Sequence, residues 1–265
     1  MPRVSLDGTA LHYLEAGAAD PPVVLLHAFP LHAGMWEPQL EALAGRFRVV
    51  APDLKGFGAS DAPDDAAAYS MEAYADELAA LLDQLQLDRV VLGGLSLGGY
   101  VAFAFLRRHR PRVAALVLAD TRPGPDTPEV RERRTNQQRQ VAEEGTSGVI
   151  EALLDGLLSE HTRQEQPAVV ERARRLMDNP AAGFTGALEA MKRRSDATSE
   201  LAAIEVPTLV VVGEDDAVSP PSVAEDMCRR IPECRLVVLP RAGHLSSLEA
   251  PDAFNEAVGA FVAHL

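Results

Sequence analysis

The sequence contains little cysteine and no long apolar segment. Its two cysteines, Cys228 and Cys234, have neither the number nor the spacing of a disulfide framework or a zinc site, so we expect structural thiols and no metal. No apolar run approaches the ~18 residues of a membrane span. Residues 1–8 contain no basic patch followed by an apolar segment. We therefore expect a cytoplasmic protein.

Positive charge is also scarce. The 25 basic residues are outnumbered by 39 acidic residues, which gives a formal net charge of −14 at pH 7. Such a charge opposes binding to nucleic acid or to an anionic membrane and favours solubility. The expected partner is therefore a small molecule, with no nucleic acid and no membrane, and no cofactor is expected. The sequence leaves open whether the chain is a monomer or a homodimer.

No glycine/serine-rich or proline-rich linker divides the chain, and its length suits one large α/β domain with an insertion. Short apolar runs recur along it, and most are continuous rather than alternating, as in strands buried on both faces of a parallel sheet. They predict strands at residues 22–27, 47–51, 89–93, 115–119, 208–212 and 235–239. Helical patterns occur at residues 71–85, 99–109, 222–230 and 250–265. This alternation predicts an α/β fold with a doubly wound, mostly parallel sheet.

Between residues 121 and 200 the alternation of strand and helix stops. Helical patterns follow one another there without a strand, at residues 127–144, 147–159, 167–177 and 180–193. An insertion between two strands of such a sheet would lie over the carboxyl ends of the strands, where ligands bind. We therefore predict a helical lid at 121–200 on a core formed by 1–120 and 201–265.

A G-x-S-x-G segment, Gly-Leu-Ser-Leu-Gly at residues 94–98, follows a predicted buried strand and precedes a helical pattern. Ser96 is a candidate nucleophile, because glycines on both sides permit a tight strand-to-helix turn that exposes the hydroxyl. A serine nucleophile needs a base, an acid that orients the base, and an oxyanion hole. The expected oxyanion donors are the backbone N–H of Leu97, in the first turn of the helix, and that of Phe29, directly after an earlier strand.

His244 is the candidate base, because it lies between the last predicted strand and the closing helix. The acid is expected on a loop after another strand, and the acidic run that follows 208–212 supplies it. Asp216 is the first choice, the adjacent Asp215 is the second, and Asp120, after an earlier strand, is the third. The acid would fix the tautomer of His244 and stabilise the imidazolium.

With these residues in place, the sequence resembles the α/β-hydrolase superfamily over nearly its whole length. The family's motifs occur in order: His-Ala-Phe-Pro at 27–30, Pro-Asp-Leu-Lys-Gly-Phe-Gly-Ala-Ser-Asp at 52–61, the G-x-S-x-G segment, Gly-Glu-Asp-Asp at 213–216, and Gly-His at 243–244 followed by Leu-Glu-Ala-Pro at 248–251. Leu31, Met35-Trp36 and residues 94–99 look most like small bacterial carboxylesterases and 3-oxoadipate enol-lactonases. The resemblance implies that the acid is Asp216.

The chain departs from the family pattern in several places. Ala28 stands where the family usually has glycine, which restricts the backbone beside the oxyanion hole and makes a left-handed conformation there costly. Lys55 replaces the usual arginine. The predicted lid contains no tryptophan, since Trp36 is the only one in the chain, and this weakens an assignment to the lactonases.

These observations predict a serine hydrolase that cleaves carboxylic esters of small apolar or aryl substrates through an acyl-enzyme. Substrate contacts are expected from apolar residues beside the motifs and in the lid, namely Trp36, Leu153, Phe184, Val218 and Leu245. Other activities remain open: an enol-lactonase-like lactone hydrolase, a perhydrolase or cofactor-free haloperoxidase, a hydrolase or lyase acting on a C–C bond, or a non-catalytic small-molecule receptor. A haloalkane dehalogenase or epoxide hydrolase would need aspartate at position 96.

Overall fold

The computed structural model describes residues 2–6 and 8–265. Its centre is an eight-stranded sheet in the order β1-β2-β4-β3-β5-β6-β7-β8. The strands are β1 (Arg3–Leu6), β2 (Thr9–Ala16), β3 (Val23–Leu26), β4 (Val49–Pro52), β5 (Val90–Leu95), β6 (Val113–Ala119), β7 (Thr208–Gly213) and β8 (Cys234–Leu239). The pairs β1–β2 and β2–β4 are antiparallel and the other pairs are parallel. The predicted α/β fold with a mostly parallel sheet is therefore confirmed.

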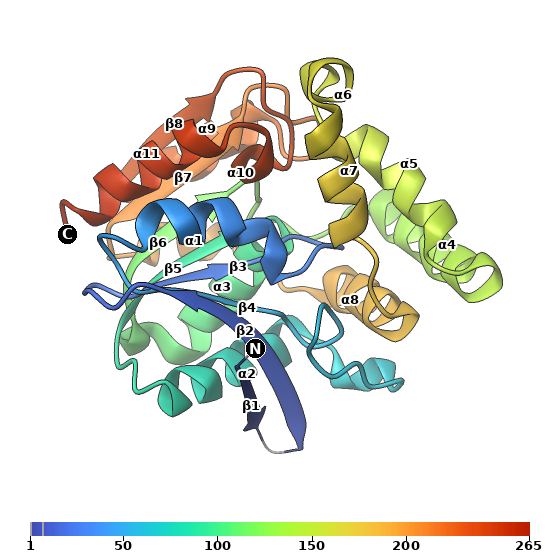
Figure 1. Cartoon of the computed structure of the whole chain (residues 1–265), viewed down its shortest axis with the longest axis horizontal. Helices are drawn as coiled ribbons and strands as arrows, with labels where there is room; N and C mark the ends of the chain where they lie inside the picture. The colour runs from blue at the N-terminus through green and yellow to red at the C-terminus, as the bar shows by residue number, and fades with distance from the viewer. Residues whose placement is uncertain (1, 7) are drawn as a thin grey trace.

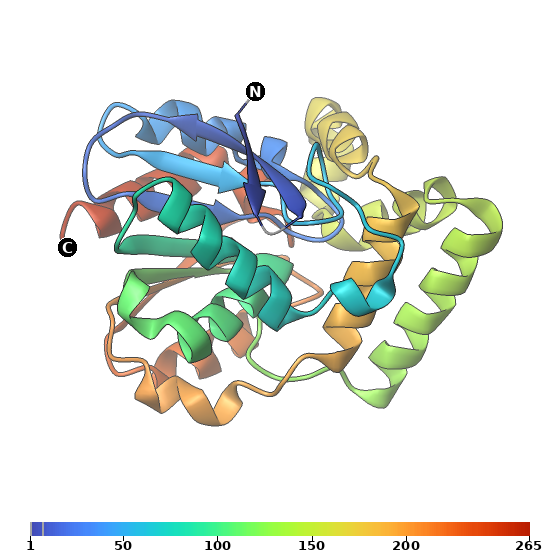
Figure 2. The ribbon, with the colours of Figure 1, turned by 90° about the horizontal axis from the view of Figure 1, so that it is seen from below.

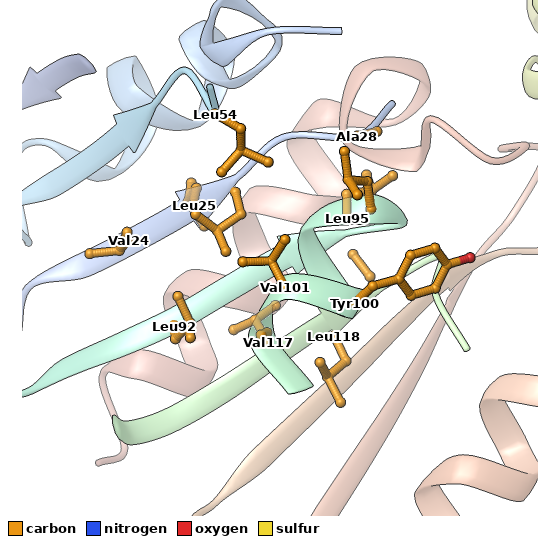
Figure 3. Packing of buried hydrophobic residues seen from close by; sticks show 14 of the residues in the cluster. Val24, Leu25, Ala28, Leu54, Leu92, Leu95, Tyr100, Val101, Val117 and Leu118 are labelled. Atoms are coloured by element: carbon orange, nitrogen blue, oxygen red, sulfur yellow. The ribbon is translucent and has the colours of Figure 1, made fainter. Parts of the chain in front are cut away.

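Helices cover both faces of the sheet (Figures 1 and 2). α2 packs beside α3 on one face, and α1 packs beside α11 on the other. The core helices are α1 (Glu37–Leu43), α2 (Met71–Gln84), α3 (Leu97–His109), α9 (Pro221–Arg230), α10 (Ser246–Glu249) and α11 (Pro251–Val262). Because the central strands are covered on both sides, every residue of β3, β4, β5 and β7 is buried. Figure 3 shows part of this core, where Leu25 of β3 and Val117 of β6 lie near Val101 of α3.

The six predicted strands correspond to β3–β8, with ends that differ by at most two residues. The sequence did not indicate β1, β2 or α1. The first two strands form an antiparallel edge that is partly exposed, so their polar and apolar residues are mixed and no continuous apolar run marks them. α1 has only seven residues, which is too short to show a helical period.

Consecutive helices fill the chain between β6 and β7 and lie together beyond one end of the sheet (Figures 1 and 2). We call them the cap helices: α4 (Pro128–Glu144), α5 (Ser147–Leu157), α6 (Glu160–Glu165), α7 (Pro167–Leu176) and α8 (Ala181–Arg193). Four of them match predicted helices with ends within two residues, and α6 lies where only a separator was expected. The side chain of Ser159 accepts a hydrogen bond from the N–H of Thr162 and so begins this short helix.

The expectation that the two cysteines are structural thiols is wrong. Cys228, near the end of α9, and Cys234, at the start of β8, form a disulfide with 5.4 Å between their Cα atoms. The short connection from α9 to β8 brings the two residues within the usual Cα separation of a disulfide, which their sequence spacing alone did not reveal.

No helix in the described part of the chain combines the length and apolar character needed to cross a membrane.

Candidate active site

The segment between β5 and α3 forms a sharp turn at Ser96. Ser96 has φ 54° and ψ −107°, a conformation that costs a non-glycine residue of the order of 1–3 kcal/mol. Its flanking glycines allow the turn: a Cβ on Gly94 would lie 2.2 Å from the carbonyl carbon of Gly98, and one on Gly98 would lie 2.3 Å from the oxygen of Leu26. The G-x-S-x-G pattern therefore has a steric cause, because α3 can approach β5 and β3 so closely only without these side chains.

Three side chains from separate loops form a hydrogen-bonded chain. The Oγ of Ser96 lies 2.9 Å from Nε2 of His244, and Nδ1 of His244 lies 2.9 Å from Oδ2 of Asp216. His244 and Asp216 are each only 2% exposed, so bulk water scarcely competes for these contacts. Because an ionised carboxylate only accepts hydrogen bonds, Nδ1 is the donor to Asp216, and Nε2 can accept the proton of the serine hydroxyl.

The backbone around Asp216 favours its ionised form. Its Oδ1 accepts hydrogen bonds from the N–H groups of Val218 at 2.8 Å and Ser219 at 2.9 Å. Burial by itself would raise the pKa of Asp216, but the charge of His244 and these hydrogen bonds hold that pKa below its ordinary value. Asp216 is therefore a fixed negative charge beside His244.

The other acid candidates lie elsewhere. Asp215 is exposed to solvent. Asp120 is buried and accepts a hydrogen bond from the N–H of Gly213 at 2.8 Å and another from the hydroxyl of Ser246, so it joins the ends of β6 and β7 to α10. Burial, and then the nearby charge of Asp216, raise the pKa of Asp120 well above its ordinary value. The structure thus brings Asp216, rather than Asp215 or Asp120, to Nδ1 of His244.

The two expected oxyanion donors lie close to Ser96: Leu97 follows it in the chain, and Phe29 borders the same cavity. Leu97 is the first residue of α3, and Phe29 follows β3. Among the hydrogen bonds of residues 2–6 and 8–265, neither backbone N–H has a protein acceptor, as an anion-binding position requires. Ala28 does not have a positive φ, so the strain expected at this alanine does not arise; its N–H points to Sδ of Met35 at 3.3 Å.

His27 holds the loop beside Phe29 in place. Its Nδ1 donates to the carbonyl of Ala28 at 3.0 Å, and its Nε2 accepts from the N–H of Leu54 at 3.0 Å. The side chain is fully buried, and this burial lowers its pKa to about 4. His27 is therefore neutral at pH 7, as its role as an acceptor requires.

This low pKa predicts a loss of stability in acid that His27→Gln removes. The unfolded chain takes up a proton near pH 6.5 while folded His27 does so only near pH 4, so stability falls as pH decreases between these values, by about 3 kcal/mol in total. The glutamine amide can still accept from the N–H of Leu54 but does not titrate. Urea unfolding at pH 7 and pH 4 should show a smaller loss in the variant than in the wild type. Equal losses in both proteins would contradict the assignment, and His264→Gln, at an exposed position, serves as the control.

A cavity of about 630 Å³ opens in front of Ser96 and His244. Of the expected substrate contacts, Leu153 on α5 and Val218 after β7 border it. Phe29, Leu157 and Met191 also border it. Among the described residues, no group of three or more histidine, cysteine, aspartate or glutamate side chains is arranged to hold a metal ion.

The other three expected substrate contacts are wrong, because these side chains are core residues and do not border the cavity. Trp36 is 1% exposed and packs against Phe254 of α11, with 5.8 Å between ring centroids. Phe184 is completely buried and packs edge-to-face against Phe29, with 4.8 Å between ring centroids. Leu245 follows His244 in the chain but is also completely buried. Neither proximity to a motif, for Trp36 and Leu245, nor a place in the predicted lid, for Phe184, predicted the direction of the side chain.

Sequence reasoning missed Tyr100, which borders the cavity. It lies four residues after Ser96 and so on the same face of α3, which was the available signal. The guanidinium of Arg194 lies over its ring, 4.2 Å from the centroid, and Arg194 also pairs with Asp126 at 2.5 Å. Tyr100 is thus linked through Arg194, directly after α8, to Asp126, just before α4, so the cavity wall is joined to both ends of the cap helices.

Glu249 is a second residue whose role the sequence did not reveal, although it lies in a family motif. One of its carboxylate oxygens accepts from the N–H of Ser159 at 2.8 Å, and the other accepts from the N–H of Leu245 at 3.1 Å. The N–H of His244 donates to the carbonyl of Leu157 at 2.9 Å. The loop that carries His244 is therefore attached directly to the junction of α5 and α6.

Comparisons with known proteins agree with this architecture. The sequence profile of the family described as "alpha/beta hydrolase fold" matches residues 21–251. The structure of a thermophilic esterase from Thermogutta terrifontis, with malate bound, is similar with a TM-score of 0.95 and 41% identity, over 100% of this chain and 99% of that one. An enol-lactonase from Burkholderia xenovorans LB400 gives a TM-score of 0.91 and 30% identity, over 99% of this chain and 100% of that one.

A relative found by sequence comparison agrees with these structural similarities. The chain is 28% identical over 256 residues to 3-oxoadipate enol-lactonase 2 of Acinetobacter baylyi, covering 95% of this chain and 92% of the relative. The profile, the fold and these relatives agree over nearly the full length. The chain therefore belongs to the α/β-hydrolase family, and it is a hydrolase.

Proposed function

We propose that the protein hydrolyses carboxylic esters through an acyl-enzyme intermediate. The observation that carries this proposal is the buried chain of hydrogen bonds from Ser96 through His244 to Asp216, which opens on a cavity of about 630 Å³. This arrangement supplies the nucleophile, the base and the orienting acid that acyl transfer needs.

In the first half of the reaction, Ser96 Oγ attacks the ester carbonyl while Nε2 of His244 takes its proton. The tetrahedral oxyanion is held by the N–H groups of Phe29 and Leu97, and the latter also lies at the positive end of α3. The bond to the alcohol then breaks, and His244 returns the proton to the leaving oxygen. Asp216 remains ionised throughout and stabilises the imidazolium.

In the second half, water replaces the alcohol. His244 takes a proton from the water, the resulting hydroxide attacks the acyl carbon, and the carboxylic acid leaves as Ser96 regains its proton. The substrate is a small molecule whose acyl group contacts the apolar part of the cavity, which includes Leu153, Leu157 and Val218.

Lactone hydrolysis is the second candidate, and the enol-lactonases among the similar proteins favour it. The chemistry is the same, except that the leaving alcohol stays joined to the acyl group. The two activities differ only in which substrate fits the cavity.

A panel of p-nitrophenyl esters of rising acyl length, together with an enol-lactone, tests the proposal. We expect turnover of the shorter esters and its complete loss after treatment with a serine-directed phosphonate, with the added mass on the peptide that contains Ser96. Absence of turnover across the panel, or turnover that persists in the labelled protein, would overturn the proposal.

A further inference from the structure

One wall of the cavity is formed by a polar face of α4. Six residues of α4 border the cavity. The steps between them along the sequence are three, one, three, one and three residues, which places all six on one side of the helix. They are Glu129, Glu132, Arg133, Asn136, Gln137 and Gln140. A helix normally turns apolar residues inward, yet the one buried residue of α4 is Val141. We call this face the polar stripe.

Packing within the protein does not explain the polar stripe. The side chains of Glu132, Arg133 and Gln137 make no hydrogen bond or ion pair within the described part of the chain, and all three border the space in front of Ser96. Asn136 and Gln140 bond only to Arg139 and Glu144 on their own helix. Donors and acceptors along this wall are therefore available to a ligand.

A second wall of the cavity, formed by α5, is apolar. α5 contributes Ala152, Leu153, Gly156 and Leu157, which share one helix face and carry no polar side-chain atom. The cavity thus joins an apolar wall to a hydrogen-bonding wall above one serine hydroxyl. A ligand that fills both must itself have an apolar part and a polar part.

The charges on the polar wall argue against an anionic ligand. Arg134 also borders the cavity, but its guanidinium is paired with Asp126 at 2.6 Å. Glu129 and Glu132 then outnumber Arg133, on a chain with a net charge of −14. The amides among the six provide both donors and acceptors, which is the pairing that hydroxyl groups require.

We propose that the substrate is an ester of an apolar acyl group with an uncharged, hydroxyl-rich alcohol such as a sugar or another polyol. The acyl group lies along α5 and the alcohol lies against the polar stripe. This inference rests on the proposed function: Ser96 Oγ forms a bond to the acyl carbon, the bond from that carbon to the polyol oxygen breaks, and this oxygen leaves with the proton that His244 carries. Water is the only co-reactant.

The test compares three esters with the same acyl group: 6-O-butyryl-glucose, butyl butyrate, and the anionic O-butyryl-lactate. We expect kcat/KM to be about tenfold higher for the sugar ester than for butyl butyrate, and lowest for the lactate ester. The double variant Asn136→Leu/Gln137→Met replaces two side-chain amides with apolar groups of similar length. Because each lost hydrogen bond is worth about 0.5–1.5 kcal/mol, the ratio of sugar to butyl kcat/KM should fall about tenfold. Arg131→Met, exposed on α4 and outside the cavity wall, should keep the wild-type ratio.

The outcomes separate this inference from the proposed function. Equal or faster turnover of butyl butyrate by the wild type, or an unchanged ratio in the double variant, overturns the polyol assignment while ester hydrolysis stands. Preference for the lactate ester instead assigns Arg133 to an anionic substrate and also overturns it. Absence of turnover of all three esters overturns both.

Discussion

Ser96→Ala is expected to lower kcat for p-nitrophenyl butyrate by at least about 10⁴-fold, while the protein remains folded. The hydroxyl is the only group of Ser96 that faces Nε2 of His244, at 2.9 Å, and alanine leaves the imidazole with no proton to accept. Alanine can follow the same backbone path, because the glycines at 94 and 98, rather than the serine side chain, give the turn its space. Steady-state kinetics with the purified variant, together with its thermal unfolding temperature, measure both effects.

Two controls make this result specific. Ser222→Ala removes a hydroxyl from an exposed position on α9 and should leave kcat unchanged. The phosphonate should label the wild type and Ser222→Ala but not Ser96→Ala. Ester turnover by Ser96→Ala within about tenfold of the wild type would show that another group attacks the ester, since loss of a nucleophile costs far more.

The approximate positions of the candidate site residues follow from simple rules of chain topology. In a parallel sheet the carboxyl ends of the strands share one edge, so loops after β5, β7 and β8 meet even though Ser96, Asp216 and His244 are far apart in sequence. Continuous apolar runs mark the buried strands between these loops. The order of the loops was therefore accessible from chain topology, whereas the choice of Asp216 over Asp215 rested on the resemblance to the family's motif.

The sequence did not predict which of the expected substrate-binding side chains point into the cavity. Trp36 and Leu245 lie next to motif residues, but both side chains point into the core, where their apolar surface is buried. Leu153, in contrast, borders the cavity because its helix is held over Ser96 by distant contacts such as that of Glu249 with Ser159. That contact joins residues 90 positions apart, and no local pattern encodes it.

The polar stripe shows a related limit. Its residues lie along one face of α4 and have the composition of an outward face, so the sequence alone favours solvent exposure. Four of the six, namely Glu129, Glu132, Arg133 and Asn136, are indeed exposed. Only the three-dimensional structure shows that this face borders the cavity in front of Ser96.

Asp216→Asn is expected to lower kcat at neutral pH by about 10³- to 10⁴-fold. The N–H groups of Val218 and Ser219 both point at Oδ1, at 2.8 and 2.9 Å, so they hold the amide oxygen of the introduced asparagine at that position. The amide NH₂ then faces Nδ1 of His244. Nδ1 must become an acceptor, the proton moves to Nε2, and the imidazole can no longer accept the proton of Ser96.

Asp215→Asn is the matched control, because it removes the same charge one residue away at an exposed position and leaves the hydrogen bond to Nδ1 intact. Its kcat should stay within about twofold of the wild type, since an exposed charge is screened by solvent. Comparable losses in the two variants would mean that Asp216 acts through general negative charge rather than through the tautomer of His244. A large loss in Asp216→Asn alone assigns the effect to the hydrogen bond, because both substitutions change the net charge equally.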